Sequence, residues 1–133
     1  MKALIIEDEP MVRLLLKRLL TRFFPHNVLE ASDGEEGLAI VERERPVIVF
    51  CDIFMPRLDG VGFLERLRAD PEYKDLPVVA ISSAKDRELV LKLVELRIAD
   101  YIVKPIELEP TFRRLERLIP ALLERKGQEA PQA

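Results

Sequence analysis

The stretch that decides the fold is residues 47–60, which reads Val-Ile-Val-Phe-Cys-Asp-Ile-Phe-Met-Pro-Arg-Leu-Asp-Gly. Its first five residues are apolar and run directly into Asp52, after which Pro56 and Gly60 interrupt the pattern. A short apolar run bounded by turn residues is typical of a strand buried on both faces. Open α/β sheets bind ligands at the carboxyl ends of such strands, so Asp52 is a candidate site residue. The simpler alternative is that Asp52 ends the strand or caps the following helix.

The same alternation of apolar runs and helical patterns recurs along the whole chain. Further strands are expected at residues 3–6, 27–31, 78–81 and 100–103. Helical spacing of apolar residues predicts helices at 10–24, 34–45, 60–69 and 86–98, and a last one from about Pro110, which Pro120 should kink or end early. Short connections between alternating strands and helices predict an α/β fold, a doubly wound five-stranded parallel sheet with five surrounding helices.

Composition limits the class of protein. The chain has 133 residues, 48% hydrophobic and 34% charged, with a net charge of −3. It is long enough for one domain, expected at residues 1–126, with residues 127–133 as a flexible C-terminal tail. Both signs of charge are interspersed, so neither nucleic acid nor an anionic membrane is an expected partner. No apolar stretch reaches the roughly 20 residues of a membrane span, and the single cysteine lies in an apolar run and allows no internal disulfide. The chain is therefore expected to be cytoplasmic.

Polar side chains gather at the expected ends of four strands. Glu7 and Asp8 follow the first, Asp52 the third, Ser82 the fourth and Lys104 the fifth. Carboxylates that are packed together need a cation, and an all-oxygen site suits Mg²⁺. The amine and the metal together would hold phosphoryl oxygens, and a carboxylate can attack phosphorus to form an aspartyl phosphate. An ordinary salt bridge is the simpler role for the lysine.

Four motifs carry a resemblance to a known family. Residues 6–10 read Ile-Glu-Asp-Glu-Pro, Asp52 is followed by Met-Pro at 55–56 and Asp-Gly at 59–60, residues 77–82 read Pro-Val-Val-Ala-Ile-Ser, and residues 101–105 read Tyr-Ile-Val-Lys-Pro. In this order and spacing the chain resembles a bacterial response-regulator receiver domain over essentially its whole length. The resemblance implies a flavodoxin-like sheet of strand order 2-1-3-4-5 and a phosphoacceptor module of a two-component phosphorelay.

The resemblance also implies roles for single residues. Asp52 would accept the phosphoryl group, and Lys104 would contact it. Asp8 would bind Mg²⁺ directly, Glu7 would bind it through water, and the main-chain carbonyl of Phe54 would complete the protein ligands. Ser82 and Tyr101 would be the switch residues. A cis peptide is expected between Lys104 and Pro105. A histidine kinase or a phosphotransfer protein would be the phosphodonor. The protein would assist reactions at its own Asp52 without being a turnover enzyme.

Output is expected through protein contacts, because the chain shows no DNA-binding output domain. The face would comprise the helix at 86–98, the strand at 100–103 and the last helix. The first of these helices carries more apolar residues than one core can take: Leu89, Val90, Leu91, Leu93, Val94 and Leu96. Tight packing under neighbouring loops is one explanation, and a surface for a downstream partner or a homodimer is the favoured one.

Three positions depart from the family pattern. Glu7 stands where aspartate is commoner, and Arg97-Ile98 replaces a usual Gly-Ala pair, so a residue with positive φ there would be strained. Phe54 and Ala84 occupy the positions two beyond Asp52 and Ser82, which in the family tune attack by water. Neither side chain can hydrogen-bond a water molecule, and Phe54 would obstruct it, so slow autodephosphorylation is expected.

Two other functions compete with this interpretation. A phosphohydrolase of the haloacid dehalogenase type also has an aspartate at a strand end. That family requires a second aspartate two positions later, where this chain has Phe54. The chain also lacks room for a substrate cap. A receiver-like binding module that is never phosphorylated is the third possibility, and the intact set of acids and Lys104 argues against it.

Overall fold

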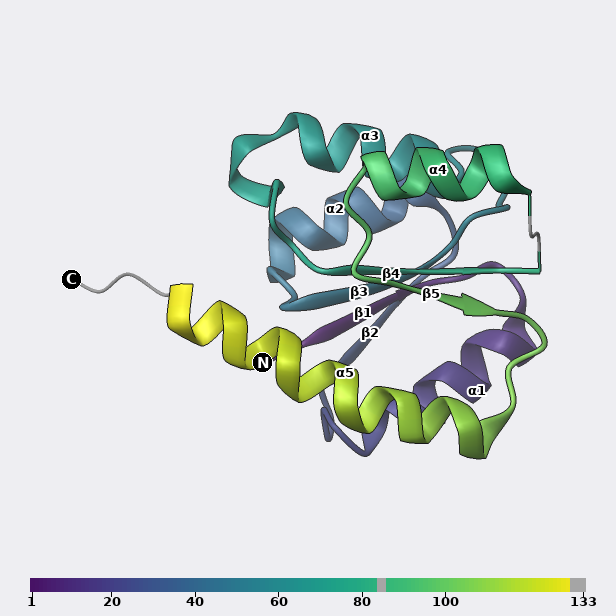
Figure 1. The fold of residues 1–133 in the computed structure, drawn as a ribbon, viewed down its shortest axis with the longest axis vertical. Helices are drawn as coiled ribbons and strands as arrows, with labels where there is room; N and C mark the ends of the chain where they lie inside the picture. The colour runs from purple at the N-terminus through teal and green to yellow at the C-terminus, as the bar shows by residue number, and fades with distance from the viewer. Residues whose placement is uncertain (84–85, 130–133) are drawn as a thin grey trace.

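The computed structural model describes residues 1–83 and 86–129, with side chains to residue 124. Five strands form one sheet, and five α-helices surround it (Figure 1). The strands are β1 (Ala3–Ile6), β2 (Val28–Ala31), β3 (Ile48–Asp52), β4 (Val78–Ser82) and β5 (Asp100–Val103). The helices are α1 (Pro10–Thr21), α2 (Gly34–Glu44), α3 (Gly60–Ala69), α4 (Arg87–Glu95) and α5 (Leu108–Glu129), with a 3₁₀ turn η1 (Pro71–Tyr73) after α3.

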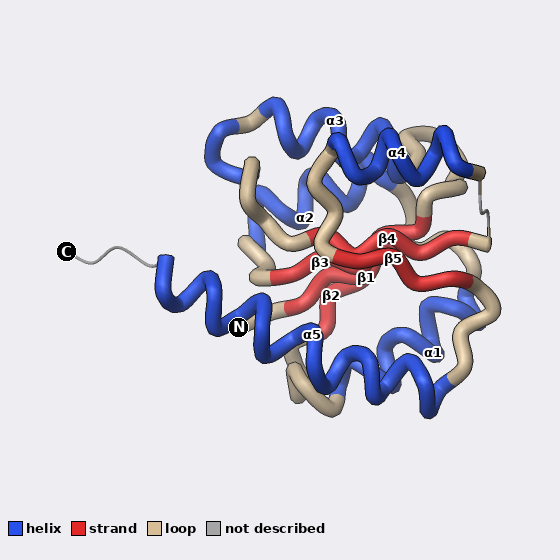
Figure 2. The backbone as a smooth tube through the Cα atoms, in the orientation of Figure 1, coloured by secondary structure: helices blue, strands red, loops and turns tan. Residues whose placement is uncertain are grey.

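The sheet is parallel throughout, in the order β2-β1-β3-β4-β5. Helices α2, α3 and α4 cover one face, and α1 and α5 cover the other (Figure 2). The chain begins in the middle of the sheet and switches direction between β1 and β3. This arrangement confirms the predicted doubly wound fold, and it gathers the carboxyl ends of β1, β3 and β4 beside the point where the strand order reverses.

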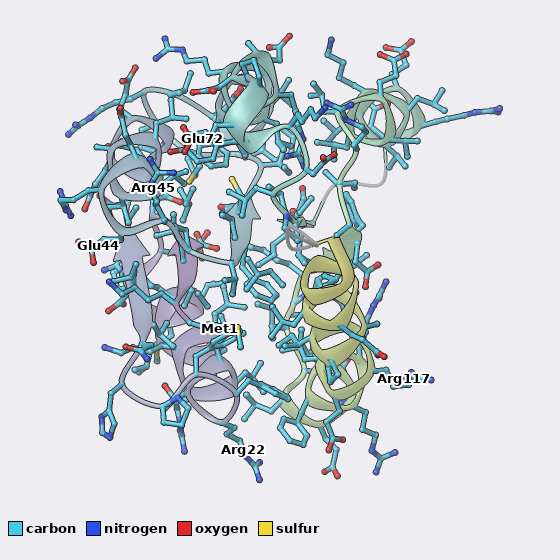
Figure 3. The ribbon with its side chains drawn as sticks, turned by 90° about the vertical axis from the view of Figure 1, so that its left-hand side faces the viewer. Met1, Arg22, Glu44, Arg45, Glu72 and Arg117 are labelled. Atoms are coloured by element: carbon cyan, nitrogen blue, oxygen red, sulfur yellow. The ribbon has the colours of Figure 1, made fainter. Side chains whose placement is uncertain are left out.

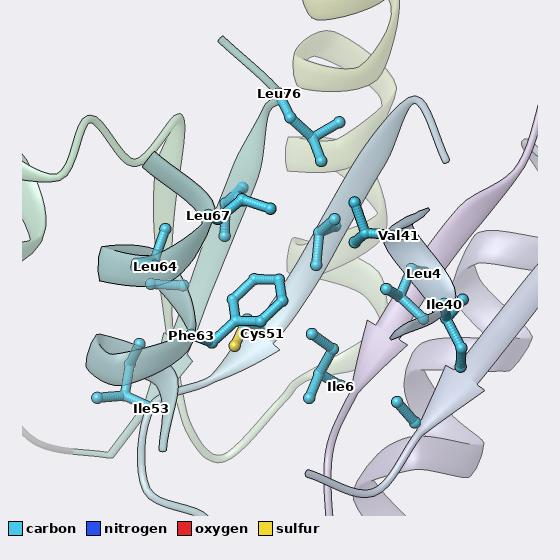
Figure 4. Close-up of a cluster of buried hydrophobic side chains, with 14 of the residues drawn as sticks. Leu4, Ile6, Ile40, Val41, Cys51, Ile53, Phe63, Leu64, Leu67 and Leu76 are labelled. Atoms are coloured by element: carbon cyan, nitrogen blue, oxygen red, sulfur yellow. The ribbon is translucent and has the colours of Figure 1, made fainter. Parts of the chain in front are cut away.

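The core forms two layers because the central strands are buried on both faces. Every residue of β3 and β4 is buried, which explains why these strands read as continuous apolar runs. Phe63 of α3 fills the centre of the layer beneath α2 and α3, against Ile6 and Cys51 (Figure 4). Cys51 is a buried free thiol, as its place in an apolar run predicts. The layer beneath α1 and α5 is built around Phe50, Leu16 and Leu115.

Aspartate side chains begin three of the helices. Asp33 Oδ1 accepts from the Glu36 amide at 2.9 Å, Asp59 Oδ1 from the Gly62 amide at 2.8 Å and Asp86 Oδ1 from the Glu88 amide at 2.8 Å. Each bond satisfies one of the amides that a helix N-terminus leaves unpaired. Asp59 therefore anchors the turn that follows β3. The capping role considered for Asp52 is taken by Asp59.

The end of α4 differs from its prediction. The helix stops at Glu95, and not at residue 98, because Arg97 adopts φ 60° and turns the chain toward β5. Arg97 thus retains the left-handed conformation that a glycine takes without strain. Arg68 of α3 holds this turn: its guanidinium donates to the carbonyl of Leu96 at 2.9 Å and to that of Arg97 at 3.1 Å. A third bond, of 2.8 Å, reaches the carbonyl of Tyr73.

Pro120 was predicted to kink the last helix or to end it early; the helix continues through Pro120 to Glu129, so the early end is wrong. Pro120 is exposed, and the loss of one amide donor is outweighed by the surrounding turns, which pack on the sheet through Leu115 and Ile119. Residues 127–129, the first of the expected tail, continue the helix, and residues 130–133 lie outside the described part. No helix in the described part of the chain is both long and apolar enough to cross a membrane.

Candidate functional site

Strand register brings the predicted site residues to one edge of the sheet. Asp52 pairs with Ile81, so it lies beside the end of β4, which Ser82 completes. Ser82 in turn pairs with Val103, the residue before Lys104. Glu7 follows β1, and its amide donates to the carbonyl of Ala31 at 2.9 Å. The fold thus assembles in space what the sequence separates by nearly a hundred positions.

Three carboxylates form the centre of the site. Glu7, Asp8 and Asp52 each offer an oxygen within 4.8 Å of the others. Glu7 is fully buried and Asp52 is 3% exposed, whereas Asp8 is half-buried and reaches the surface. Two acids buried side by side are unfavourable unless positive charge faces them.

Lys104 supplies part of that charge. Its Nζ lies 3.1 Å from Glu7 Oε1 and 3.2 Å from Asp52 Oδ2, and its side chain is 16% exposed. Burial lowers the pKa of this amine, but the bonds to the two carboxylates outweigh burial and leave the pKa above its ordinary value. The Lys104 amide donates to the carbonyl of Ser82 at 3.0 Å, and the peptide to Pro105 is cis, as expected.

Glu7 is the most perturbed acid in the site. Burial raises its pKa to about 7, while the amide of Glu9, which donates to Oε2 at 3.1 Å, and Lys104 act in the opposite direction. The negative charge of Asp52 adds to the effect of burial, and the pKa of about 7 is the net result. Its other oxygen, Oε1, is enclosed and accepts no well-formed hydrogen bond within the described residues, although Lys104 Nζ lies 3.1 Å away. The site therefore holds more negative charge than Lys104 alone satisfies.

Stability should fall with rising pH when divalent metal is chelated. The folded-state pKa of Glu7, about 7, lies above its ordinary value of 4.5. Protonated Glu7 therefore favours the folded state, so the contribution is complete below pH 4.5 and is lost as pH rises through 7. Between pH 5 and 8 in EDTA, urea unfolding should show a loss of roughly 2 kcal/mol. Glu7→Gln should flatten this dependence, and the exposed control Glu9→Gln should retain it.

The donor set fits a hard divalent cation. Carboxylate oxygens converge from β3 and from the residues after β1. One of them, Glu7 Oε1, is buried without a well-formed hydrogen bond among the described residues, and the group contains no histidine or cysteine. Such all-oxygen sites favour Mg²⁺, which binds few protein ligands and keeps several waters. Glu7, Asp8 and Asp52 are the residues that would hold it.

The residues predicted to act as switch and tuning positions occupy different surroundings. Ser82 is 1% exposed at the end of β4, and Tyr101 of β5 is half-buried and packs on the layer beneath α4. Phe54 is 58% exposed beside the site, and its amide lies 3.4 Å from Asp52 Oδ1. The aromatic ring is thus largely in solvent at the mouth of the site. Ala84, the other predicted tuning position, lies outside the described residues.

Sequence reasoning missed two arginines that support the site. Arg13 of α1 reaches back so that its guanidinium donates to the Glu7 carbonyl at 2.9 Å. Arg57, which has φ 62°, lies 3.3 Å from the buried Asp33 and ties the loop after β3 to the start of α2. Arg13 follows Glu7 by six residues, and no sequence periodicity marks such a contact between a strand end and a helix.

Comparison with known proteins decides the family. The family model described as the response regulator receiver domain matches residues 3–116. The chain belongs to that family. It is 32% identical over 121 residues to "Probable chemotaxis protein CheY" of Rhizobium etli, covering 91% of this chain and 94% of that protein.

Two further comparisons agree with this assignment of a receiver domain. The chain is 35% identical over 117 residues to "Probable C4-dicarboxylate response regulator DctR" of Bacillus subtilis, covering 87% of this chain and 51% of that protein. It therefore spans about half the length of that relative and of several others. The crystal structure of the phosphorylated cyanobacterial phytochrome response regulator RcpA superposes with a TM-score of 0.79 at 26% identity, over 92% of this chain and 93% of that one.

Proposed function

We propose that this receiver domain is a phosphorylation-controlled signalling module that carries its phosphoryl group on Asp52. The observation that carries the proposal is the position of Asp52 Oδ2, 3.2 Å from Lys104 Nζ, in a buried cluster with Glu7 and Asp8. The similar crystal structure of the response regulator RcpA is of the phosphorylated protein, which supports the proposal by analogy.

The residues of the site fit an in-line phosphoryl transfer. An Asp52 carboxylate oxygen attacks phosphorus, an O–P bond forms, and the bond from phosphorus to the donor's leaving nitrogen or oxygen breaks. Lys104 is placed to hold one phosphoryl oxygen, and the buried Ser82 hydroxyl lies at the end of the neighbouring strand. Mg²⁺, when bound by Glu7 and Asp8 with Asp52, supplies the positive charge that neutralises the incoming group.

The direct test is phosphorylation by a small donor. Acetyl phosphate and Mg²⁺ should add the mass of one phosphoryl group to the intact protein, and EDTA should prevent it. Asp52→Asn should remove the mass gain entirely, because an amide cannot act as the nucleophile. Asp59→Asn, a nearby acid that caps α3, is the matched control and should still be labelled. Labelling of the Asp52 variant would contradict the assignment.

Membership of the receiver-domain family supports a proposal for the phosphodonor and the compartment. We propose a histidine kinase or a phosphotransfer protein as donor, in the cytoplasm, with the receiver acting on its own Asp52 rather than as a turnover enzyme. The dehalogenase-type alternative has no support at the site, because Phe54 occupies the position where that family places its second acid. If the module were never phosphorylated, the buried acids and Lys104 would have no chemical function at this site.

The proposed output face is α4, β5 and α5. The structure leaves Leu91 and Val94 of α4 53% and 59% exposed, while Leu93 is buried. Val103 of β5 is 41% exposed and adds to the apolar area. We propose that a downstream protein or a second copy covers this surface after phosphorylation. Sedimentation of phosphorylated Val94→Glu should show weaker association than wild type with unchanged folding.

The phosphorylated state should be long-lived. Phe54 offers no hydrogen bond to an attacking water, and neither does the alanine at position 84. In Mg²⁺, the phosphoryl group of the wild-type protein should decay at least about tenfold more slowly than that of Phe54→Asn combined with Ala84→Glu, since a side chain that acts as a full general base toward water contributes roughly 100-fold or more. Decay is followed by intact mass after removal of the donor. Equal decay rates would count against a tuning role for both positions.

A further inference from the structure

A cavity lies at the edge of the sheet opposite Asp52. It has a volume of about 750 Å³. Its walls come from the loop after α2, from η1 and the loop before β4, from the turn between α4 and β5, and from α5. All of these loops precede strands (Figure 1), and their residues that line the cavity place it at the amino ends of β3, β4 and β5. Its size is that of a pocket for a small organic molecule.

Positive charge predominates in the wall. Four cations, Arg45, Arg68, Lys74 and Arg97, face two acids, Glu72 and Asp75, although the chain as a whole is acidic. Arg45 and Glu72 form an ion pair with each other, and Figure 3 shows the two side chains together at the edge of the molecule. This pair leaves three cations and one acid, which is the opposite of the balance in the rest of the protein.

The remaining cations lack acidic partners. Arg68, Lys74 and Arg97 have no carboxylate within ion-pair distance in the described part of the chain, and the bonds of Arg68 go to three backbone carbonyls. Burial lowers the pKa of Arg68, the charge of Arg97 lowers it further, and Asp75 acts in the opposite direction. Two guanidiniums thus repel each other at this wall, and an anion between them would relieve the repulsion.

The rest of the cavity is apolar. Leu76 and Ile98 precede β4 and β5, and Leu118 and Leu122 line it from α5. We propose that this cavity binds a small amphiphilic anion, whose phosphate or carboxylate contacts Arg97, Lys74 and Arg68 while its apolar body lies on these side chains. The site is independent of the chemistry at Asp52, but it borders the turn that ends α4, so an occupant would contact one boundary of the proposed output face.

The test uses unphosphorylated protein in calorimetric titrations with small probes that carry one or both halves of the required chemistry. 2-Naphthyl phosphate should bind, whereas neutral 2-naphthol and inorganic phosphate should each bind at least tenfold more weakly, since each lacks one half of the required chemistry. Comparing 2-naphthoate with 2-naphthyl phosphate then separates a preference for carboxylate from one for phosphate, because the two probes share the same apolar body. Backbone amide shifts in NMR spectra should change at residues 97–99, 118, 119, 121 and 122.

Arg97→Gly is the decisive variant. It removes the guanidinium while glycine accepts the φ of 60°, so its melting temperature should be unchanged or higher. Its affinity for 2-naphthyl phosphate should fall about tenfold, the cost of one charge-assisted contact. Arg113→Gln, on the outer face of α5, is the control and should bind as wild type. Ala121→Trp, which fills the cavity, should abolish binding. Undiminished binding to Arg97→Gly, or equal binding of 2-naphthol, would overturn the proposal.

Discussion

Replacing Lys104 with methionine should slow phosphoryl uptake from acetyl phosphate by roughly 100-fold or more. The amine is the one side-chain cation in the described structure within 3.2 Å of both Glu7 and Asp52, and it is 84% buried. Methionine keeps the apolar stem but removes the charge that would hold a phosphoryl oxygen as the transfer proceeds. The initial rate of mass gain, at saturating Mg²⁺, measures the effect.

The same variant should also lose stability in a way that depends on pH. Without Lys104, Glu7 and Asp52 remain buried with no cation between them, and breaking a buried pair in this way costs about 3 kcal/mol. The loss should be largest at pH 8 in EDTA and smaller at pH 6, where Glu7 takes up a proton, since its pKa is about 7 already in the wild type. Added Mg²⁺ should restore much of it.

Lys92→Met is the matched control for both measurements. Lys92 lies 3.5 Å from Glu65 on the outside of α4, with both side chains about half exposed. Exposed ion pairs contribute little, so uptake and stability should both remain close to wild type. Uptake by Lys104→Met within threefold of the wild-type rate would show that the lysine serves the fold and not the transfer.

Gly60→Ala should unfold the protein more readily, by about 3 kcal/mol, through a clash that cannot relax. A Cβ at this position would lie 2.6 Å from Ile53 Cα and 2.7 Å from the carbonyl oxygen of Asp52, both backbone atoms. The Gly60 amide also donates to the Ile53 carbonyl at 2.9 Å, so α3 begins in direct contact with the end of β3. Relieving the clash must move the segment that carries Asp52.

Gly62→Ala, one half-turn further along α3, separates this effect from a general intolerance of the helix. Its Cβ would meet Leu58 Cδ1 at 2.5 Å, the end of a flexible side chain that can rotate away. Alanine also favours a helix interior by up to about 1 kcal/mol over glycine. Urea unfolding should therefore rank Gly62→Ala at or above wild type and Gly60→Ala well below it. The reverse order would contradict the close packing of α3 on β3.

Local patterns explain how much of the fold was predictable. The buried strands β1, β3 and β4 had to be apolar runs, and all five strands lie within one residue of their predicted bounds. Helix boundaries were less predictable where packing decides them. The chain leaves α4 at Arg97 because Arg68, from another helix, binds the carbonyls of the turn, and α5 passes through Pro120 because its neighbouring turns lie on the sheet.

The candidate site divides in the same way. The acids, the serine and the lysine could be named because each lies at the end of a strand or just after it, and parallel strands end at one edge. Arg13 could not be named, since its bond to the Glu7 carbonyl depends on how α1 leaves the sheet. The exposure of Phe54, and the guanidiniums of Arg68 and Arg97 that face no ion-paired carboxylate among the described residues, likewise depend on distances between elements that no sequence pattern encodes.

By itself, therefore, the sequence determined the class of sheet, the family motifs and the chemical identity of the site, because these depend on residue type and on strand and helix periodicity. Only the tertiary structure decided the electrostatics. Whether Glu7 is buried, whether Lys104 lies between two acids, and whether Arg68 faces Arg97 depend on desolvation and on separations of a few ångströms. Those separations are set by the packing of elements far apart along the chain.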